Sequence, residues 1–305
     1  MVHKRTFGSN ISYTVCRQAV KWYDLRTMGY EDNMLANIDR QRKPDDSFVI
    51  KNAHEKAQRV LSENLIDPAN FTDLYGEENV AKDLAEVSRL EDLFKNNETQ
   101  MTAEVMEAIF FEQSELSDWL GPHAETIKTS KYDDYINGVD LVAEFDNGET
   151  HSNHLALAVD ITFGSATLGN KFERIKKEIL ADKLAQVKYF ESHGFKGTLL
   201  QIPRVVIGVE NDRVKELAAL WNQGKKKDLS EHPVRDLILK QISSQLEEFL
   251  ALAIANNSNG AIKSYRKALQ TVGAIMIEQG VQNIGELVSD KVWLSIQNSL
   301  TNLKN

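Results

Sequence analysis

The hydrophobic pattern of this chain changes its period at Gly138, and this change restricts the possible folds more than any other feature. Before it, from about Tyr13 to Leu120, apolar residues recur at spacings of three and four, as in amphipathic helices. From Gly138 to Phe145 apolar and polar residues alternate, which is typical of a half-buried strand. A helical region that gives way to strands predicts an α/β chain.

Further elements follow the first strand. The turn-forming residues Asp146-Asn147-Gly148 precede a second strand, expected over 154–163. A helix is expected over about 170–192, and a continuously apolar third strand over 197–209, broken at Pro203. The order is therefore helix, strand, strand, helix, strand.

The flanks of this α/β segment are helical in pattern. We expect a helical N-terminal region over 1–100, an α/β core over 101–210 and a helical C-terminal region over 211–305. The net charge of −9 excludes a uniformly basic nucleic-acid binder. Acidic residues are concentrated over 77–149, whereas 171–227 is basic, so a polyanion could bind only locally. With one cysteine and no long apolar run, we expect a cytoplasmic protein without a membrane span.

Two aspartates occupy the non-core face of the central strands. Asp140 alternates with Val139 and Leu141, and Asp160 lies in the second strand. An eight-residue connection would place Phe145 opposite His154 and bring the aspartates together, whereas a tight turn at Asn147-Gly148 would separate them. Two close carboxylates in a half-buried sheet need a proton or a cation, and Mg²⁺ or Mn²⁺ suits their oxygens.

These strands, with Gly138-Val-Asp140-Leu-Val and Val159-Asp160-Ile-Thr162, resemble the core of the PD-(D/E)XK nuclease superfamily. The resemblance covers about a third of the chain and implies a restriction-endonuclease-like mixed sheet flanked by helices. It implies Mg²⁺-dependent hydrolysis of phosphodiester bonds, in DNA rather than RNA. Asp140 and Asp160 would hold the metal, and Glu112 would be the helix glutamate, with Glu115 behind it and Glu107 five residues before. Asp133 and Asp134 could also reach a metal at the strand entrance.

The motif departs from the family pattern at Thr162, where a lysine is expected. Some members are similar in taking this lysine from the following helix, which here suggests Lys171, then Lys177. The same helix carries Arg174, Lys176 and Lys177, which we expect to bind a phosphate backbone. Their alternative interpretation is a solvated helix face with intrahelical ion pairs.

Two functions from different classes remain open at this point. The first is a metal-dependent nuclease, possible as a homodimer, with Asp140, Asp160, Glu112 and Lys171 at its centre. The second is a catalytically degenerate module of the same fold that binds nucleic acid or a protein partner. A serine or cysteine hydrolase and a nucleotide-binding enzyme are disfavoured, because the chain has no nucleophile elbow, phosphate-binding loop or dinucleotide fingerprint.

Overall fold

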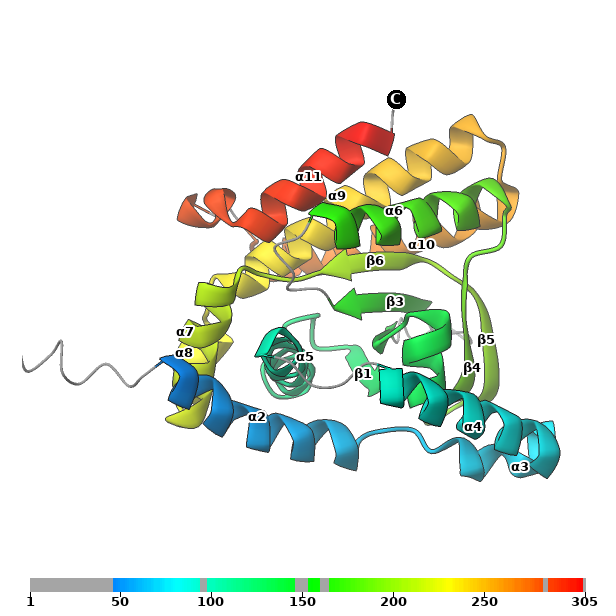
Figure 1. Cartoon of the computed structure of the whole chain (residues 1–305). Coiled ribbons are helices and arrows are strands. Elements are labelled where there is room, and N and C mark those ends of the chain that lie inside the picture. The colour runs from blue at the N-terminus through cyan, green and yellow to red at the C-terminus, as the bar shows by residue number, and fades with distance from the viewer. Residues whose placement is uncertain (1–45, 94–97, 146–152, 160–164, 282–284, 304–305) are drawn as a thin grey trace, which may run out of the picture. The chain divides into compact units, whose positions relative to one another are not determined.

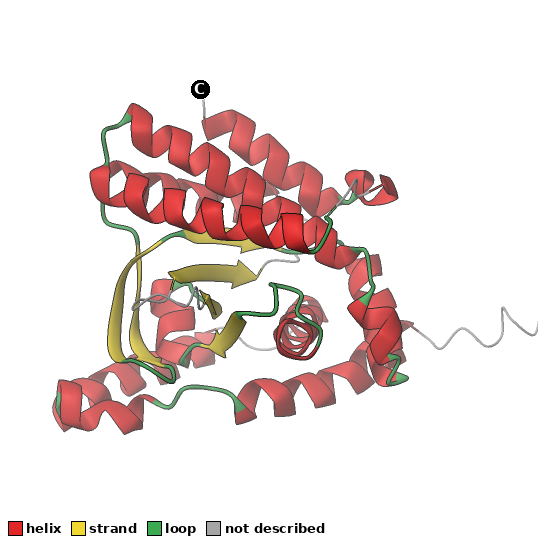
Figure 2. Ribbon diagram, turned by 180° about the vertical axis from the view of Figure 1, so that it is seen from behind, coloured by secondary structure: helices red, strands yellow, loops and turns green. Residues whose placement is uncertain are grey.

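A computed structural model describes residues 46–93, 98–145, 153–159, 165–281 and 285–303. The chain divides between Phe48 and Val49, and everything below concerns the unit from Val49 to Asn305. Figure 1 shows its sheet strands among helices, and Figure 2 shows the same elements from behind.

Helices dominate the described residues from 46 to 116, as the spacing of apolar residues predicts, and the rest of the predicted helical region, over 1–45, lies outside the described residues. Asp67 caps the short turn that links the first two of them, since its carboxylate accepts from the Ala69 N–H at 2.9 Å. The last of these helices, expected from Thr102 to Leu120, is confirmed with earlier ends. The elements are α2 (Asp46–Glu63), η1 (Pro68–Phe71), α3 (Thr72–Tyr75), α4 (Glu77–Leu93) and α5 (Glu98–Leu116).

A four-stranded sheet forms the centre, in the order β1-β2-β3-β6. The first three strands are antiparallel to one another, and β6 runs parallel to β3. The strand β1 was not predicted, because its five residues carry no clear alternation and follow a Gly-Pro break. The bounds are β1 (Ala124–Lys128), β2 (Leu141–Phe145), β3 (Asn153–Val159) and β6 (Arg204–Ile207).

The register between β2 and β3 differs by one residue from the expected one. Phe145 lies opposite Asn153, and Leu141 lies opposite Leu157. The expected pairing of Phe145 with His154 was wrong, because it would put the apolar stripes of the two strands on opposite faces of the sheet. The alternative register, which a tight two-residue turn at Asn147-Gly148 would set, was also wrong.

The segment after β3 contains more strand than predicted. The expected helix over 170–192 is α6 (Ser165–Leu180), and the chain then turns into β4 (Ala185–Glu191). The expected strand over 197–209 is two strands, β5 (Lys196–Ile202) and β6, which lie in different sheets on either side of Pro203. β4 and β5 form an antiparallel hairpin of their own.

Both faces of the central sheet are covered. Leu141, Ala143 and Phe145 of β2 join the main core, as expected, together with apolar residues of α5 and α6. On the opposite face, Val142 packs in a second cluster with residues of the β4–β5 hairpin. Val139 was predicted to face the main core, but it joins this second cluster because the chain bends before β2.

The outer edge of the sheet is closed by the longest helix. Gln245 of α9 accepts from the Val206 N–H at 2.8 Å and donates to its carbonyl at 2.7 Å. Gln241 makes the same pair of bonds to Gly208. These side chains replace a neighbouring strand for β6. The C-terminal elements are α7 (Asn211–Asn222), α8 (Lys226–Ser230), α9 (Val234–Ala255), α10 (Asn259–Glu278), η3 (Gly285–Ser289) and α11 (Lys291–Leu303).

The architecture is therefore a mixed α/β one, with α6, α9, α10 and α11 gathered on the β6 side of the sheet (Figure 1). None of the helices in the described ranges is long and apolar enough to cross a membrane.

Candidate functional site

Asp140 directly precedes β2, at a sharp bend of the chain. The π-helical turn η2 (Asp133–Asn137) ends at Gly138, which has a φ of +61°. The positive φ favours glycine here, and a Cβ at Gly138 would also displace the guanidinium of Arg174, from which it would lie 2.8 Å. The Gly138 carbonyl accepts from Arg204 at 2.7 Å. Arg204 thus stabilises the bend, and the bend fixes the backbone position of Asp140.

Carboxylates from two different elements and one backbone carbonyl meet a buried lysine beside this bend. Lys128, at the end of β1, has its ammonium 2.8 Å from Glu107 of α5 and 3.4 Å from Asp134 of η2. It also donates to the Asp140 carbonyl at 3.1 Å. We call Glu107, Lys128, Asp134 and Asp140 the acid–lysine cluster.

The electrostatics of the cluster show a shortage of positive charge. Burial, then Asp134 and Glu107, raise the pKa of Asp140 well above its ordinary value, against the opposing effect of Lys171 and Lys128. Burial also raises the pKa of Glu107, which Lys128 offsets only in part.

The shared lysine responds in the opposite sense. Burial alone would lower the pKa of Lys128, but Glu107, Asp134 and Asp140 outweigh it and raise the pKa. Lys128 is therefore a permanent cation that several acids share, and it cannot serve as a base near neutral pH.

A groove of 890 Å³ leads to the cluster. Glu107, Lys128 and Asp134 line it, and residues of α2 and α5 form much of the rest. The side chains of Glu107 and Lys128 are only 12% and 6% exposed, so they are accessible at the bottom of the groove and not at its rim. The lining does not include Asp140, whose backbone carbonyl accepts from the Lys128 ammonium.

The expected helix glutamate lies elsewhere. Glu112 accepts a hydrogen bond from the Trp221 indole and lies 3.5 Å from the ammonium of Lys56. Glu115 accepts from the Thr126 N–H of β1. The glutamate that α5 brings to Asp140 is instead Glu107, which the sequence placed on the same helix but gave no reason to prefer.

Lys171 is one of the groups that lower the pKa of Asp140, so the structure brings these two predicted residues within electrostatic reach. Lys128, in contrast, was missed. Its strand was not recognised, and only the fold brings it next to Glu107. Asp160 and Thr162 lie outside the described residues.

The predicted phosphate-binding residues of α6 have different surroundings. The guanidinium of Arg174 donates to the Ile136 carbonyl at 3.2 Å and lies 3.4 Å from Glu178, so it braces the bend before β2. Lys177 is exposed and Lys176 is half-buried. Arg174 and Lys177 are thus both exposed, but the guanidinium of Arg174 is already engaged within the fold.

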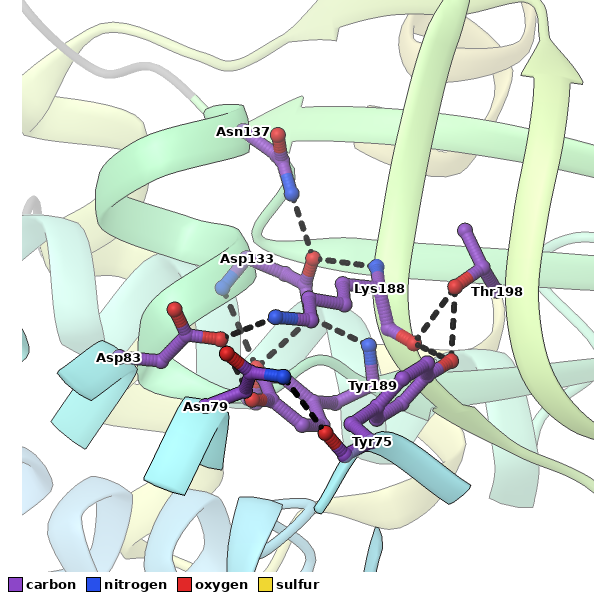
Figure 3. A network of polar contacts seen from close by, with 9 residues as sticks. Tyr75, Asn79, Asp83, Asp133, Asn137, Lys188, Tyr189 and Thr198 are labelled. Atoms are coloured by element: carbon purple, nitrogen blue, oxygen red, sulfur yellow. Dashed lines mark hydrogen bonds and ion pairs between the residues drawn. The ribbon is translucent and has the colours of Figure 1, made fainter. Parts of the chain in front are cut away.

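Asp133, which sequence placed near a metal, has a structural role instead. It is fully buried and accepts from Ser130 and Asn137 and from the backbone N–H groups of Lys188 and Tyr189 (Figure 3). All its lone pairs are thereby directed to protein donors, so it ties η2 to β4 and is not available to a ligand.

The donor chemistry near Asp140 suits a hard divalent cation, since it consists of carboxylate oxygens short of positive charge. Among the residues that the structure describes, however, no group of three or more His, Cys, Asp or Glu side chains could hold a metal ion. A complete set of ligands would need a further donor, the position that sequence assigns to Asp160.

Comparison with protein-family models, with curated proteins and with solved structures finds no match for this chain.

Proposed function

We propose that this protein is a divalent-metal-dependent nuclease that hydrolyses phosphodiester bonds, with DNA as the preferred substrate. The observation that carries the proposal is the clustering of Asp140 with Asp134 and Glu107 beside a groove that the latter two line, and burial with these two carboxylates raises the pKa of Asp140. Buried carboxylates that lack charge compensation are typical of metal and catalytic sites.

The arrangement of elements also supports a restriction-endonuclease-like core. A helix, α5, precedes an antiparallel strand pair, β2 and β3, and α6 then leads by way of the β4–β5 hairpin to β6, which is parallel to β3. Asp140 stands at the entrance to the first strand of the expected motif. Glu107 comes from the preceding helix and Lys171 from the following one.

In this proposal Asp140 and Glu107 hold Mg²⁺ or Mn²⁺, with Asp160 as the further ligand. The bound cation would activate water and neutralise charge on the phosphate. Lys128 keeps Glu107 and Asp134 in place as a fixed cation, and Lys171 faces Asp140 from α6, where it can stabilise negative charge on the substrate.

Calorimetry with Mn²⁺ and cleavage of labelled DNA by the full chain test the proposal. Asp140→Asn and Glu107→Gln should each abolish Mn²⁺ binding and reduce cleavage by at least 100-fold, a typical effect of removing a catalytic group. Both substitutions keep side-chain size and remove a buried charge, so the fold should persist, as checked by circular dichroism.

The matched control is Glu112→Gln, on the same helix. Its side chain contacts Lys56 and Trp221 instead of the cluster, so cleavage should stay within about twofold of wild type. Equal loss in Glu107→Gln and Glu112→Gln, or Mn²⁺ binding that survives Asp140→Asn, would contradict the assignment.

A degenerate binding module is the second candidate, and the contacts of Lys128 favour it. This ammonium already lies against Glu107, Asp134 and the Asp140 carbonyl, and so occupies a position where a cation would neutralise the acids. In that case Mn²⁺ does not bind, and EDTA leaves nucleic-acid binding unchanged. The same calorimetric titration therefore separates the two functions.

A further inference from the structure

Basic side chains gather on α6, on the turn after it and on the first half of α10. Residues 165–183 and 259–268 together carry eight basic and three acidic residues, although the whole chain has a net charge of −9. Six of the eight form no ion pair with a carboxylate of the described residues, and four of these six side chains are exposed. We call the six the basic surface: Lys176, Lys177, Lys183, Lys263, Arg266 and Lys267.

Most other cations of the basic stretch over 171–227 are neutralised by a nearby acid of their own helix, hairpin or turn. Their ion pairs are Lys196–Glu191, Arg213–Glu216, Lys215–Asp212, Lys225–Asp228 and Lys227–Glu231. Two of the three acids near the basic surface are used within the fold instead. Glu178 pairs with Arg174 and Arg204, and Asp182 accepts from the backbone of α10. This leaves Glu173 to offset the charge of the basic surface.

The fold joins two basic segments that are distant in the chain. The Asp182 carboxylate accepts from the Gly260 N–H at 3.0 Å and from the Ala261 N–H at 2.7 Å, so the end of α6 meets the start of α10 (Figure 1). Lys183 directly follows Asp182, and Lys263 lies in the first turn of α10. The charges of both helices therefore meet at this junction.

The cations of α10 also share one face of their helix. Lys263, Arg266 and Lys267 are spaced by three and four residues, on the side opposite the buried Ala261 and Tyr265. Like charges four residues apart destabilise a helix, and no acidic residue lies between them in the sequence. Folding alone gives no reason for this arrangement, whereas an anionic partner would.

We propose that the basic surface binds the phosphate backbone of a nucleic acid. Ammonium and guanidinium groups without internal partners can bind phosphates and release the counterions of the polyanion. The choice of nucleic acid rests on the proposed function, because α6 also carries Lys171, which lies within electrostatic reach of Asp140. The basic surface thus continues along α6 away from the candidate site.

The length of α6 sets the distance between the two contacts. From Lys171 to Leu180 the helix axis rises about 14 Å, which is about the length of four nucleotides of a DNA strand. We therefore expect the basic surface to hold phosphates at least about four nucleotides away from the bond at the candidate site.

Fluorescence anisotropy with the full-length protein and a labelled DNA duplex, in EDTA, measures binding without cleavage. The test variant is the triple substitution Lys263→Ala/Arg266→Ala/Lys267→Ala on α10. It should bind at least about tenfold more weakly than wild type. The slope of log affinity against log salt concentration should fall by about two to three, because each lost phosphate contact lowers it by about one.

Two further triple variants are the controls. Lys263→Arg/Arg266→Lys/Lys267→Arg keeps the charge of α10 and should bind within about twofold of wild type. Lys51→Ala/Lys82→Ala/Lys227→Ala removes the same charge from exposed positions of α2, α4 and α8, and should also stay within about twofold. Equal weakening by the two alanine triples would overturn the inference, because binding would then follow total charge.

Vesicles that contain phosphatidylserine test the other common polyanion, an anionic membrane. If the α10 alanine triple lost binding to these vesicles while its affinity for DNA stayed unchanged, the basic surface would bind lipid headgroups and the inference would be overturned.

Cleavage of DNA with Mn²⁺ separates this inference from the proposed function. The α10 alanine triple should raise KM at least about fivefold and keep kcat within about twofold, because the basic surface lies away from the reacting bond. DNA binding that depends on α10, without any cleavage by wild type, supports the inference and contradicts the nuclease. Cleavage with an unchanged KM in the triple variant supports the nuclease and overturns the inference. Absence of both binding and cleavage overturns both.

Discussion

The position of Asp140 suits a catalytic or metal-binding carboxylate, but its charge lowers the stability of the folded protein. Burial and two neighbouring carboxylates raise its pKa, so ionisation near neutral pH works against the folded state. Groups of this kind are often found where function requires a charge that folding alone would not select.

Asp140→Asn should therefore stabilise the metal-free protein. With EDTA present, we expect the melting temperature to rise by about 2–4 °C, which corresponds to about 1 kcal/mol for a chain of this size. Asp212→Asn on α7 is the control, because the Asp212 side chain is 84% exposed and its removal should change little. A melting temperature that falls in Asp140→Asn would show that the carboxylate stabilises the fold.

His232 gives a pH dependence that is separate from the site. Burial lowers its pKa, and Glu216 opposes this only in part. Its Nδ1 accepts from the Val234 N–H at 3.3 Å, a bond that the protonated ring cannot make. The folded state therefore favours the neutral ring. Its contribution is complete above the unfolded pKa of about 6.5 and is lost as the pH falls through the lower folded pKa.

His232 should accordingly lower the urea midpoint as the pH falls from 7 to 5, in opposition to Asp140, whose protonation favours the folded state. In His232→Asn, which keeps an acceptor but does not titrate, this part of the decrease should disappear. If the urea midpoints of the wild type and of His232→Asn differ by the same amount at pH 7 and at pH 5, protonation of His232 is not coupled to unfolding.

At the scale of elements, α9 completes the central sheet. Gln241 and Gln245 satisfy the outer N–H and carbonyl groups of β6, which would otherwise form an open edge. Burial of a glutamine side chain without partners would destabilise the folded state. Here the hydrogen bonds to the backbone of Val206 and Gly208 offset that destabilisation.

Gln245→Leu should lower the free energy of unfolding by about 2–4 kcal/mol, because it leaves the buried N–H and carbonyl of Val206 without partners. Urea denaturation measures this change. Gln270→Leu, on the exposed face of α10, should stay within about 0.5 kcal/mol of wild type. Equal effects of the two substitutions would show that α9 does not complete the edge.

At the scale of the whole unit, a cationic side chain joins segments that are far apart in the chain. The Lys188 ammonium of β4 lies 5.2–5.3 Å from the ring centres of Tyr75, Tyr132 and Tyr189, and it pairs with Asp83 of α4 (Figure 3). The Tyr189 hydroxyl also donates to Asp83, at 2.5 Å. These contacts bind α3 and α4 to the β4–β5 hairpin.

Asp83→Asn should cost about 2–3 kcal/mol, since it leaves the partly buried Lys188 without its carboxylate. We expect faster amide hydrogen exchange in α4 before the rest of the unit is affected. Asp73→Asn, exposed on α3, is the control. If Asp83→Asn increased the rate of amide hydrogen exchange equally in all elements of the unit, these contacts would not stabilise α4 in particular.

Local pattern was sufficient for the class of the fold, for β2 and β3, and for the helices that flank them. Alternation and three-to-four spacing are properties of a single element, and they can be recognised without knowing its neighbours. The same pattern placed Asp140 within a strand that begins at Gly138, whereas β2 begins at Leu141 and Asp140 directly precedes it.

The partners of Asp140 depended on tertiary structure. Apolar residues surround α5 on several sides, so spacing could not show whether Glu107 or Glu112 faced the cluster. Lys128 belongs to a short strand without alternation, and β4 continued a pattern that also suits a helix. The register of β2 and β3 aligns their apolar stripes, which the pattern of either strand alone could not decide. Each of these outcomes depends on contacts between residues distant in the chain, which local periodicity does not encode.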